Sequence, residues 1–182
     1  ADHDDDTVAF TDYHGIYINA CNHITWSLPT RLLRSMSLEG FNAHECGHNL
    51  FTDNRIWNSY FSKLEKGKFY PKMPDGLDSM QKLHAGDILE AVLDEADTVP
   101  YQVIMSVAHA LQNILEDGYV DARYSYEFPG SPAKGIALNN LRFADTVPEI
   151  SEMINRKYYD HSIVLNLLIQ YIRAHEVNNL SG

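Results

Sequence analysis

A helix-compatible apolar run from Leu32 to Phe51 contains the sequence HECGH at residues 44–48, which matches the pattern HExxH. Residues four apart lie on one face of an α-helix, so His44 and His48 can present both imidazoles to one metal ion. Glu45 is then placed to exchange protons with a water molecule on that metal. The motif predicts a helix that faces a second, ligand-bearing element, as in a metal-dependent hydrolase.

The two histidines could instead be ordinary residues of a helix surface, because so short a pattern also occurs by chance. Three features favour a metal site: the glutamate between them, the close approach that Gly47 allows, and an acidic run farther along the chain. Cys46 points to a different side of this helix, where we expect a small buried side chain without chemistry.

The length and charge of the chain narrow its class. With 182 residues the chain has the size of a single domain, which we expect over residues 7–182. Residues 1–6 are mostly aspartate, and we expect a disordered acidic N-terminus there. A net charge of −11 without a basic cluster argues against a nucleic-acid partner.

Neither a membrane span nor an export signal is expected. The most apolar segment, residues 163–172, is interrupted by Asn166 and Gln170 and is shorter than the roughly 20 residues that a span needs. The cysteines, Cys21 and Cys46, are too few for a disulfide framework, and we interpret both as free thiols. These observations predict a cytoplasmic protein without a membrane partner.

The remaining pattern predicts a mainly helical α+β chain. Two extended runs on either side of a turn at Gly15, residues 8–11 and 16–19, predict a small N-terminal β-hairpin. Apolar residues at three- and four-residue spacing predict helices, with Gly40 as the weak point of the first. The expected helices cover residues 30–51, 53–64, 78–96, 100–124, 133–143, 148–158 and 161–177.

A zinc ion held by two histidines of one helix needs a third protein ligand from elsewhere. In the expected helix over residues 100–124, Glu116 falls on a polar stripe beside an apolar one. A buried polar stripe needs partners, and a metal on the facing helix would satisfy it. We therefore expect the third ligand between Asn113 and Arg123.

The segment at residues 40–53, GFNAHECGHNLFTD, together with the distant run NILED at residues 113–117, resembles zincin-type metallopeptidase domains of bacterial and phage proteins. Those domains are often linked to a von Willebrand factor A domain. Residues 11–19 also look like the strand that precedes the metal helix in that group. The resemblance covers residues 7–123 and implies a zincin-like fold, a peptide or protein substrate, and a von Willebrand factor A domain in the full-length protein or in a partner.

The resemblance also implies a gluzincin-like site with one Zn²⁺ per chain. In such a site His44 and His48 are metal ligands and Glu45 is the catalytic acid–base. Three protein ligands leave a fourth position for water, whose pKa a zinc ion lowers toward about 7. Glu45 would take the water proton and return it to the leaving amine.

Two acidic residues are candidates for the third ligand that the resemblance implies. Glu116 is the first choice and Asp117 is the alternative. The familiar gluzincin helix carries an aspartate four residues after its ligand. Val120 stands at that distance from Glu116, whereas Asp121 stands four residues after Asp117.

Other polar residues are candidates for supporting roles. A tetrahedral intermediate needs a second electrophile beside the metal. The candidates for this role are His109, Tyr119, Arg123 and Tyr124. His109 could equally be a core residue, and Asp53 either orients a ligand histidine or caps the helix that follows it.

The sequence predicts a zinc metallopeptidase. The alternative is a catalytically silent zincin-like module that serves binding or assembly in a larger von Willebrand factor A-associated protein. The intact Glu45 favours the enzyme, because a purely structural zinc site needs four protein ligands and no adjacent base. A third interpretation is a metal-delivery protein or an assistant of a chelatase.

Overall fold

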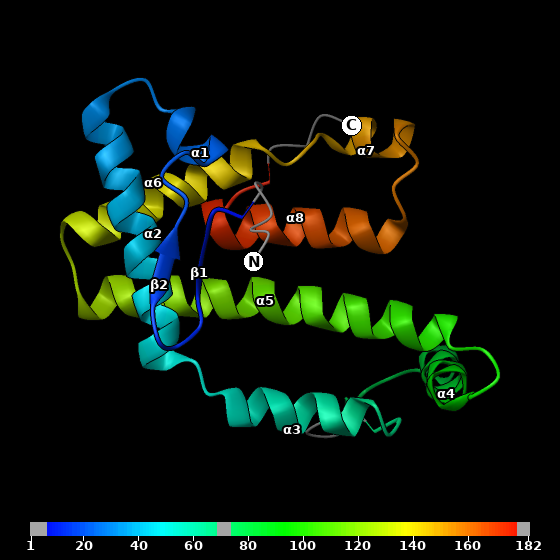
Figure 1. The fold of residues 1–182 in the computed structure, drawn as a ribbon. Coiled ribbons are helices and arrows are strands. Elements are labelled where there is room, and N and C mark those ends of the chain that lie inside the picture. The colour runs from blue at the N-terminus through cyan, green and yellow to red at the C-terminus, as the bar shows by residue number, and fades with distance from the viewer. Residues whose placement is uncertain (1–6, 69–73, 178–182) are drawn as a thin grey trace. The chain divides into compact units, whose positions relative to one another are not determined.

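The computed structural model describes residues 7–68 and 74–177 (Figure 1). Over these residues the protein is mainly helical, with a two-stranded antiparallel sheet near the N-terminus. The expected disordered segment, residues 1–6, lies outside the described residues. The chain divides into a first compact unit, residues 1–52 and 111–182, and a second unit, residues 53–110. The single domain expected over residues 7–182 stays a prediction.

The first unit begins with the expected hairpin. Strand β1 (Ala9–Thr11) pairs antiparallel with β2 (Ile16–Ile18). Asp12 shapes the turn between them, because its carboxylate accepts hydrogen bonds from the backbone N–H groups of His14 and Gly15 at 2.9 and 2.7 Å. The short helix α1 (His23–Trp26) follows the hairpin and was not expected from the sequence.

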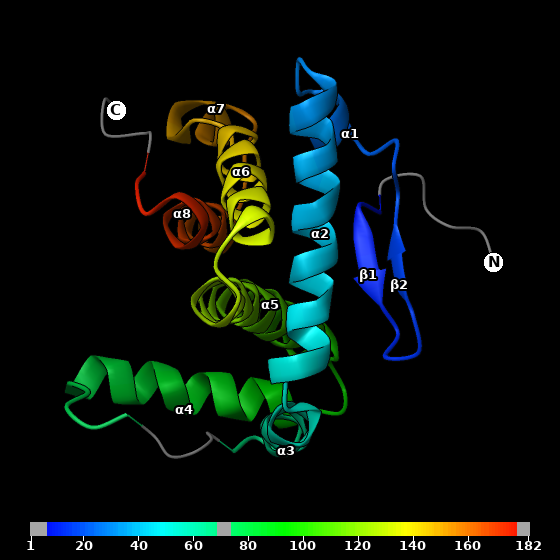
Figure 2. The same ribbon diagram turned by 90° about the vertical axis from the view of Figure 1, so that its left-hand side faces the viewer.

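Helix α2 (Arg31–Phe51) carries the HExxH motif and is continuous through Gly40. Helix α6 (Ser131–Asp145) crosses α2 at this position. A Cβ atom on Gly40 would collide with the backbone of Gly135, and one on Gly135 would collide with the carbonyl oxygen of Met36. Figure 2 shows α2 running between the hairpin and α6. The expected weak point of the helix is thus the place where two backbones touch.

Four buried polar side chains tie α1, α2 and α6 together. The Asn22 amide donates to the Thr25 hydroxyl at 3.0 Å, and the hydroxyl oxygens of Thr25 and Ser37 lie 2.9 Å apart. The Ser37 hydroxyl donates to Oδ1 of Asn139 at 2.6 Å, and the Asn139 amide donates to the backbone oxygen of Ser37. Because these partners satisfy one another, the chain of hydrogen bonds fixes how α6 lies on α2.

The C-terminal helices complete the first unit. Helix α7 (Ile150–Asn155) is shorter than expected, and Lys157, just after it, has a left-handed backbone with φ 59°. Helix α8 (Asp160–Ala174) packs against α6, where the buried Gln170 amide donates to the backbone oxygen of Ala144. Trp26 lies elsewhere in this unit and is exposed, with the Arg34 guanidinium 4.4 Å above its ring.

The second unit contains α3 (Asn54–Leu64), α4 (Ser79–Leu93) and the first part of α5 (Val99–Glu127), whose remainder belongs to the first unit. Trp57 and Tyr60 of α3 pack edge to face, with ring centroids 6.4 Å apart. The buried hydrophobic side chains among the described residues of this unit are Leu64, Ala85 and Val92. Within the part of the chain that the structure describes, no helix is both long and apolar enough to span a membrane.

Candidate metal site

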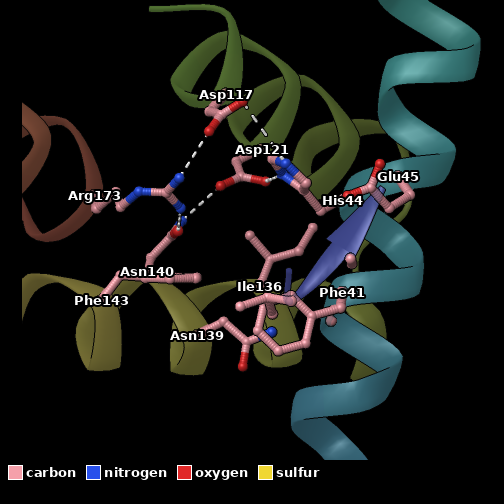
Figure 3. Close-up of a pocket in the computed structure, with 13 residues that line it drawn as sticks. Phe41, His44, Glu45, Asp117, Asp121, Ile136, Asn139, Asn140, Phe143 and Arg173 are labelled. Atoms are coloured by element: carbon pink, nitrogen blue, oxygen red, sulfur yellow. Dashed lines mark hydrogen bonds and ion pairs between the residues drawn. The ribbon is translucent and has the colours of Figure 1, made fainter. Parts of the chain in front are cut away.

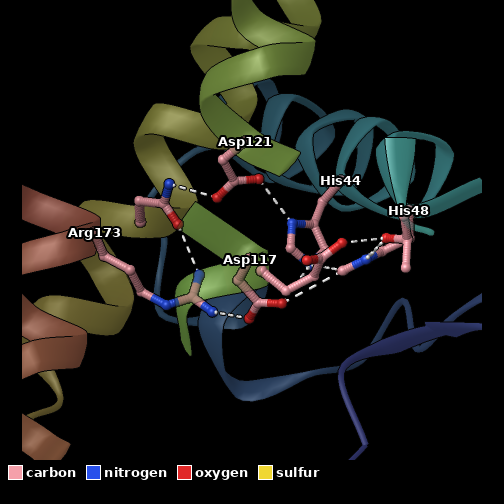
Figure 4. A network of polar contacts seen from close by, with 8 residues as sticks. His44, His48, Asp117, Asp121 and Arg173 are labelled. Carbon is pink, nitrogen blue, oxygen red and sulfur yellow. Dashed lines mark hydrogen bonds and ion pairs between the residues drawn. The ribbon is translucent and has the colours of Figure 1, made fainter. Parts of the chain in front are cut away.

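Two helices of the first unit bring three potential ligands together. The Nε2 atoms of His44 and His48 on α2 lie 3.2 Å apart. Oδ1 of Asp117 on α5 lies 3.4 Å from Nε2 of His48 and 3.8 Å from Nε2 of His44 (Figure 4). These three side chains could hold a metal ion. Zn–N bonds of 2.0–2.1 Å in a tetrahedral site place neighbouring ligand atoms about 3.3 Å apart, close to the distances found here.

The other nitrogen of each imidazole has its own acceptor. Nδ1 of His44 lies 2.7 Å from Oδ1 of Asp121, and Nδ1 of His48 lies 3.1 Å from Oγ1 of Thr52. The Thr52 hydroxyl donates to the carboxylate of Glu116 at 2.6 Å, which leaves its oxygen to accept from His48. In the tautomers that donate from Nδ1, both Nε2 atoms carry lone pairs that face each other and Asp117. Lone pairs that converge in this way favour a cation between them.

A second layer of polar contacts joins the two aspartates from behind. The Asn140 amide on α6 donates to Oδ2 of Asp121 at 2.8 Å. Arg173 on α8 donates through Nη1 to Oδ1 of Asn140 and through Nη2 to Oδ2 of Asp117, each at 2.7 Å. Helices α5, α6 and α8 therefore all contribute to the position of the site's carboxylates (Figure 4).

Burial and neighbouring charges shift the pKa values of three groups in the site. Burial raises the pKa of Glu45, although the two histidines partly oppose this shift. Burial alone would lower the pKa of His44, but the hydrogen bond and charge of Asp121, with other carboxylates, raise it. Burial alone would raise the pKa of Asp117, but His48, His44 and Arg173 bring it below its ordinary value.

A cavity of about 170 Å³ opens beside the site (Figure 3). Glu45, which is only 6% exposed, lines this cavity together with His44 and Asp117. The apolar side chains that line the cavity are those of Val8, Ala9, Phe41, Ile136 and Phe143. Asn139, Asn140 and Arg173 add a polar part to the wall. The first strand of the hairpin, β1, therefore reaches the cavity.

The structure places the two acidic candidates in different surroundings. Asp117, the alternative, faces the histidine Nε2 atoms, whereas the carboxylate of Glu116, the first choice, is bound by Thr52. Consecutive residues are turned by about 100° around a helix, so only one of the two acids can face the imidazoles. Asp121, four residues after Asp117, lies on the same face of α5 and contacts His44 through Nδ1.

Two further candidates belong to the second unit. Asp53 caps α3, since its carboxylate accepts from the backbone N–H of Arg55 at 3.0 Å. It also pairs with the Arg55 guanidinium, and the hydrogen bonds from Arg55 lower the pKa of Asp53 to about 2. His109 stacks on Phe61, with ring centroids 3.8 Å apart. The structure thus supports the capping interpretation of Asp53 and a packing role for His109.

The last three candidates, Tyr119, Arg123 and Tyr124, lie in the second half of α5. Tyr119 is exposed, and Arg123 forms an ion pair with Glu127 at 2.7 Å. Tyr124 packs against Phe128, and burial raises its pKa. None of the three candidates is among the described residues that line the cavity.

Both cysteines are free thiols, as expected. Cys21 is exposed and Cys46 is half-buried. Burial raises the pKa of Cys46, and the charge of Glu45 adds to this shift, so the thiol form is favoured over the reactive thiolate.

Sequence reasoning missed Thr52, Asn140 and Arg173 as parts of the polar network. Thr52 lies four residues after His48, so the helical period could have pointed to it. Asn140 and Arg173 lie 19 and 56 residues from the aspartates that they bind, and no local spacing connects them. Comparison of the chain with protein-family models, with curated proteins and with solved structures found no match.

Proposed function

We propose that this chain is a zinc-dependent metallopeptidase of the zincin type. Its zinc ligands are His44, His48 and Asp117, and Glu45 is the general acid–base. The observation that carries the proposal is the convergence of two Nε2 lone pairs and one carboxylate oxygen, with both Nδ1 atoms occupied by other acceptors. Histidines that bind metals in proteins are oriented in this manner through their second nitrogen.

The kinds of ligand atoms support zinc. Two imidazole nitrogens and one carboxylate suit Zn²⁺, whereas Mg²⁺ and Ca²⁺ prefer oxygen ligands. The carboxylates of Glu45, Asp117 and Asp121 outnumber the Arg173 guanidinium around the cavity. A divalent cation would offset this excess of negative charge.

A set of three protein ligands supports catalysis over a purely structural role. Such a set leaves one position for water, and bound zinc makes hydroxide available near neutral pH. Glu45 lines the cavity beside His44, where it can receive the proton of that water and deliver it to the leaving amine. Asp121 and Thr52 keep the imidazoles in the orientation that this chemistry requires.

The cavity wall supports a peptide substrate. Val8 and Ala9 bring the backbone of the hairpin to the same cavity as Glu45 and Asp117. An extended peptide can be held by strand backbone while apolar walls receive a side chain. The wall formed by Phe41, Ile136 and Phe143 offers such apolar surface.

Metal content and peptide cleavage test the proposal together. We expect about one zinc per chain in the purified parent protein. The zinc should be lost in His48→Ala and Asp117→Ala. It should be kept in Glu116→Ala, because the Glu116 carboxylate of the parent accepts from Thr52 and is not one of the proposed ligands. Glu45→Gln should keep the zinc and lose cleavage of a casein or peptide-library substrate by at least about 100-fold.

Two results would contradict the proposal. A folded parent that binds no zinc would exclude the metal site. A parent that binds zinc, cleaves no substrate and behaves like Glu45→Gln in every assay would instead support the catalytically silent binding module.

A further inference from the structure

We infer that Arg173 is a positioning residue that makes Asp117 a single-oxygen metal ligand. The inference rests on the proposed metal site and assigns a role to the C-terminal helix α8, which carries none of the ligands. Arg173 lies 56 residues from Asp117 in the sequence, and the fold brings its guanidinium to the back of the ligand carboxylate.

The two oxygens of Asp117 have different partners. Oδ1 faces the histidines, at 3.4 Å from Nε2 of His48. Oδ2 accepts a hydrogen bond from Nη2 of Arg173 at 2.7 Å, a distance typical of a strong charge-assisted bond. A free carboxylate could turn or bind a metal through both oxygens, but the guanidinium holds Oδ2 away from the imidazoles. Arg173 thereby limits the number of oxygens that the site offers to a metal.

Arg173 is itself held rigidly. Its Nη1 donates to the Asn140 oxygen at 2.7 Å, and its guanidinium lies 4.7 Å from the centre of the Phe143 ring. Only 17% of its side chain is exposed, so water competes weakly for these contacts. A residue that positions another must be fixed in this way.

The contacts close a circuit around the site. Asn140 gives its oxygen to Arg173 and its amide hydrogen to Oδ2 of Asp121, which binds Nδ1 of His44 through its other oxygen. One ligand, Asp117, is therefore connected to another, His44, through an arginine, an asparagine and an aspartate. Removing Arg173 breaks this connection at its only positively charged member.

A purely structural role for Arg173 makes a different prediction. A guanidinium that only anchors α8 to α5 would affect the melting temperature and leave the metal affinity of the folded protein unchanged. A positioning residue changes the metal affinity and the coordination geometry of protein that is still folded.

The test measures zinc affinity by competition with a chromophoric chelator, and coordination geometry by the visible absorption of the Co²⁺-loaded protein. The variants are Arg173→Gln, Arg173→Lys and Asn140→Ala, all measured below their melting temperatures. Arg142→Gln is the matched control, because Arg142, on an exposed part of α6, forms an ion pair with Asp145 and donates to the Ser27 hydroxyl beyond the end of α1.

We expect Arg173→Gln to weaken zinc binding by about 10- to 100-fold and to alter the Co²⁺ spectrum. Arg173→Lys should recover part of the affinity, because it keeps a positive charge near Asp117. Asn140→Ala should fall between the parent and Arg173→Gln, and Arg142→Gln should match the parent.

A folded Arg173→Gln with the parent's zinc affinity and Co²⁺ spectrum would overturn the inference and leave the proposed function intact. A folded parent without zinc would overturn both. If Arg173→Gln does not fold, Arg173→Lys decides: parent affinity with an unchanged spectrum contradicts the positioning role, and weaker binding with an altered spectrum supports it.

Discussion

One face of α2 meets two other helices, and the two crossings are built in opposite ways. At Gly40 the backbone of α2 touches the backbone of α6 at Gly135, with no side chain between them. Seven residues later, at Gly47, α5 approaches with the side chain of Val120, and His44 lies between the two crossings. About two turns of α2 thus separate the backbone contact with α6 at Gly40 from the contact with α5 at Gly47, beside which the polar site lies.

The difference shows how one helix can be held in place by its neighbours and still carry the polar groups of a site. The crossing at Gly40 sets the distance between α2 and α6 and leaves no room for adjustment. The crossing at Gly47 lets α5 come close enough for Asp117 and Asp121 to reach the imidazoles. Substitutions at the two glycines should therefore differ in size and in whether they can be rescued.

The largest effect is expected at the backbone crossing. Gly40→Ala or Gly135→Ala places a methyl group against backbone atoms that cannot rotate away, so we expect a loss of about 3 kcal/mol or more in the free energy of unfolding. Urea denaturation measures this change. Gly86→Ala, in α4 with open space around it, is the matched control and should be neutral or stabilising. Equal urea midpoints for Gly40→Ala and the parent would refute the backbone contact.

The second crossing should yield a smaller effect that can be rescued. A Cβ on Gly47 would lie 2.5 Å from Cγ1 of Val120, and we expect Gly47→Ala to cost about 1–2 kcal/mol of unfolding free energy. The double variant with Val120→Ala removes the obstructing methyl group. A double-mutant cycle should therefore show a favourable coupling, and additive losses would show that Val120 is not the obstacle.

The polar part of the second crossing can be tested without changing its packing. Thr52→Val keeps the shape of the side chain but removes the acceptor for Nδ1 of His48. We expect zinc binding to weaken about 10-fold in a chelator competition, because the imidazole loses its orienting partner. Thr11→Val, at a threonine of the hairpin whose hydroxyl bonds to Gly15 and Asn49, should leave the affinity unchanged.

The smallest effect is expected at the N-terminus of α2, away from both crossings. The Thr30 hydroxyl accepts from the backbone N–H of Leu33, and Thr30→Ala should cost about 1 kcal/mol of unfolding free energy. Thr30→Ser should restore most of it. Zinc affinity should not change, and a parallel loss of zinc binding would mean that the two ends of α2 are coupled.

The sequence predicted the hairpin and the long helices because local periodicity and turn residues decide those elements. Helix α1, with four residues, is too short to show a period. Gly40 was misinterpreted as a weak point because helix propensity considers one helix alone, and the partner that makes the glycine necessary is almost a hundred residues away.

The residues of the candidate site also divide into those that local spacing predicts and those that only tertiary packing brings together. His44, Glu45 and His48 follow from the helical repeat, and the choice between Glu116 and Asp117 could be narrowed by the spacing to Asp121. The contacts of Arg173 and Asn140 could not be predicted, because tertiary packing alone brings α6 and α8 to the back of the aspartates.

Each compact unit carries one of the chain's two tryptophans, Trp26 in the first and Trp57 in the second. The chain thus contains one intrinsic fluorophore for each unit. In the Trp57→Phe variant the fluorescence comes from Trp26, an exposed indole beneath the Arg34 guanidinium. In the Trp26→Phe variant it comes from Trp57, an indole packed against Tyr60. Coincident urea transitions in these two variants would mean that the units unfold together, and separate transitions would give each unit its own stability.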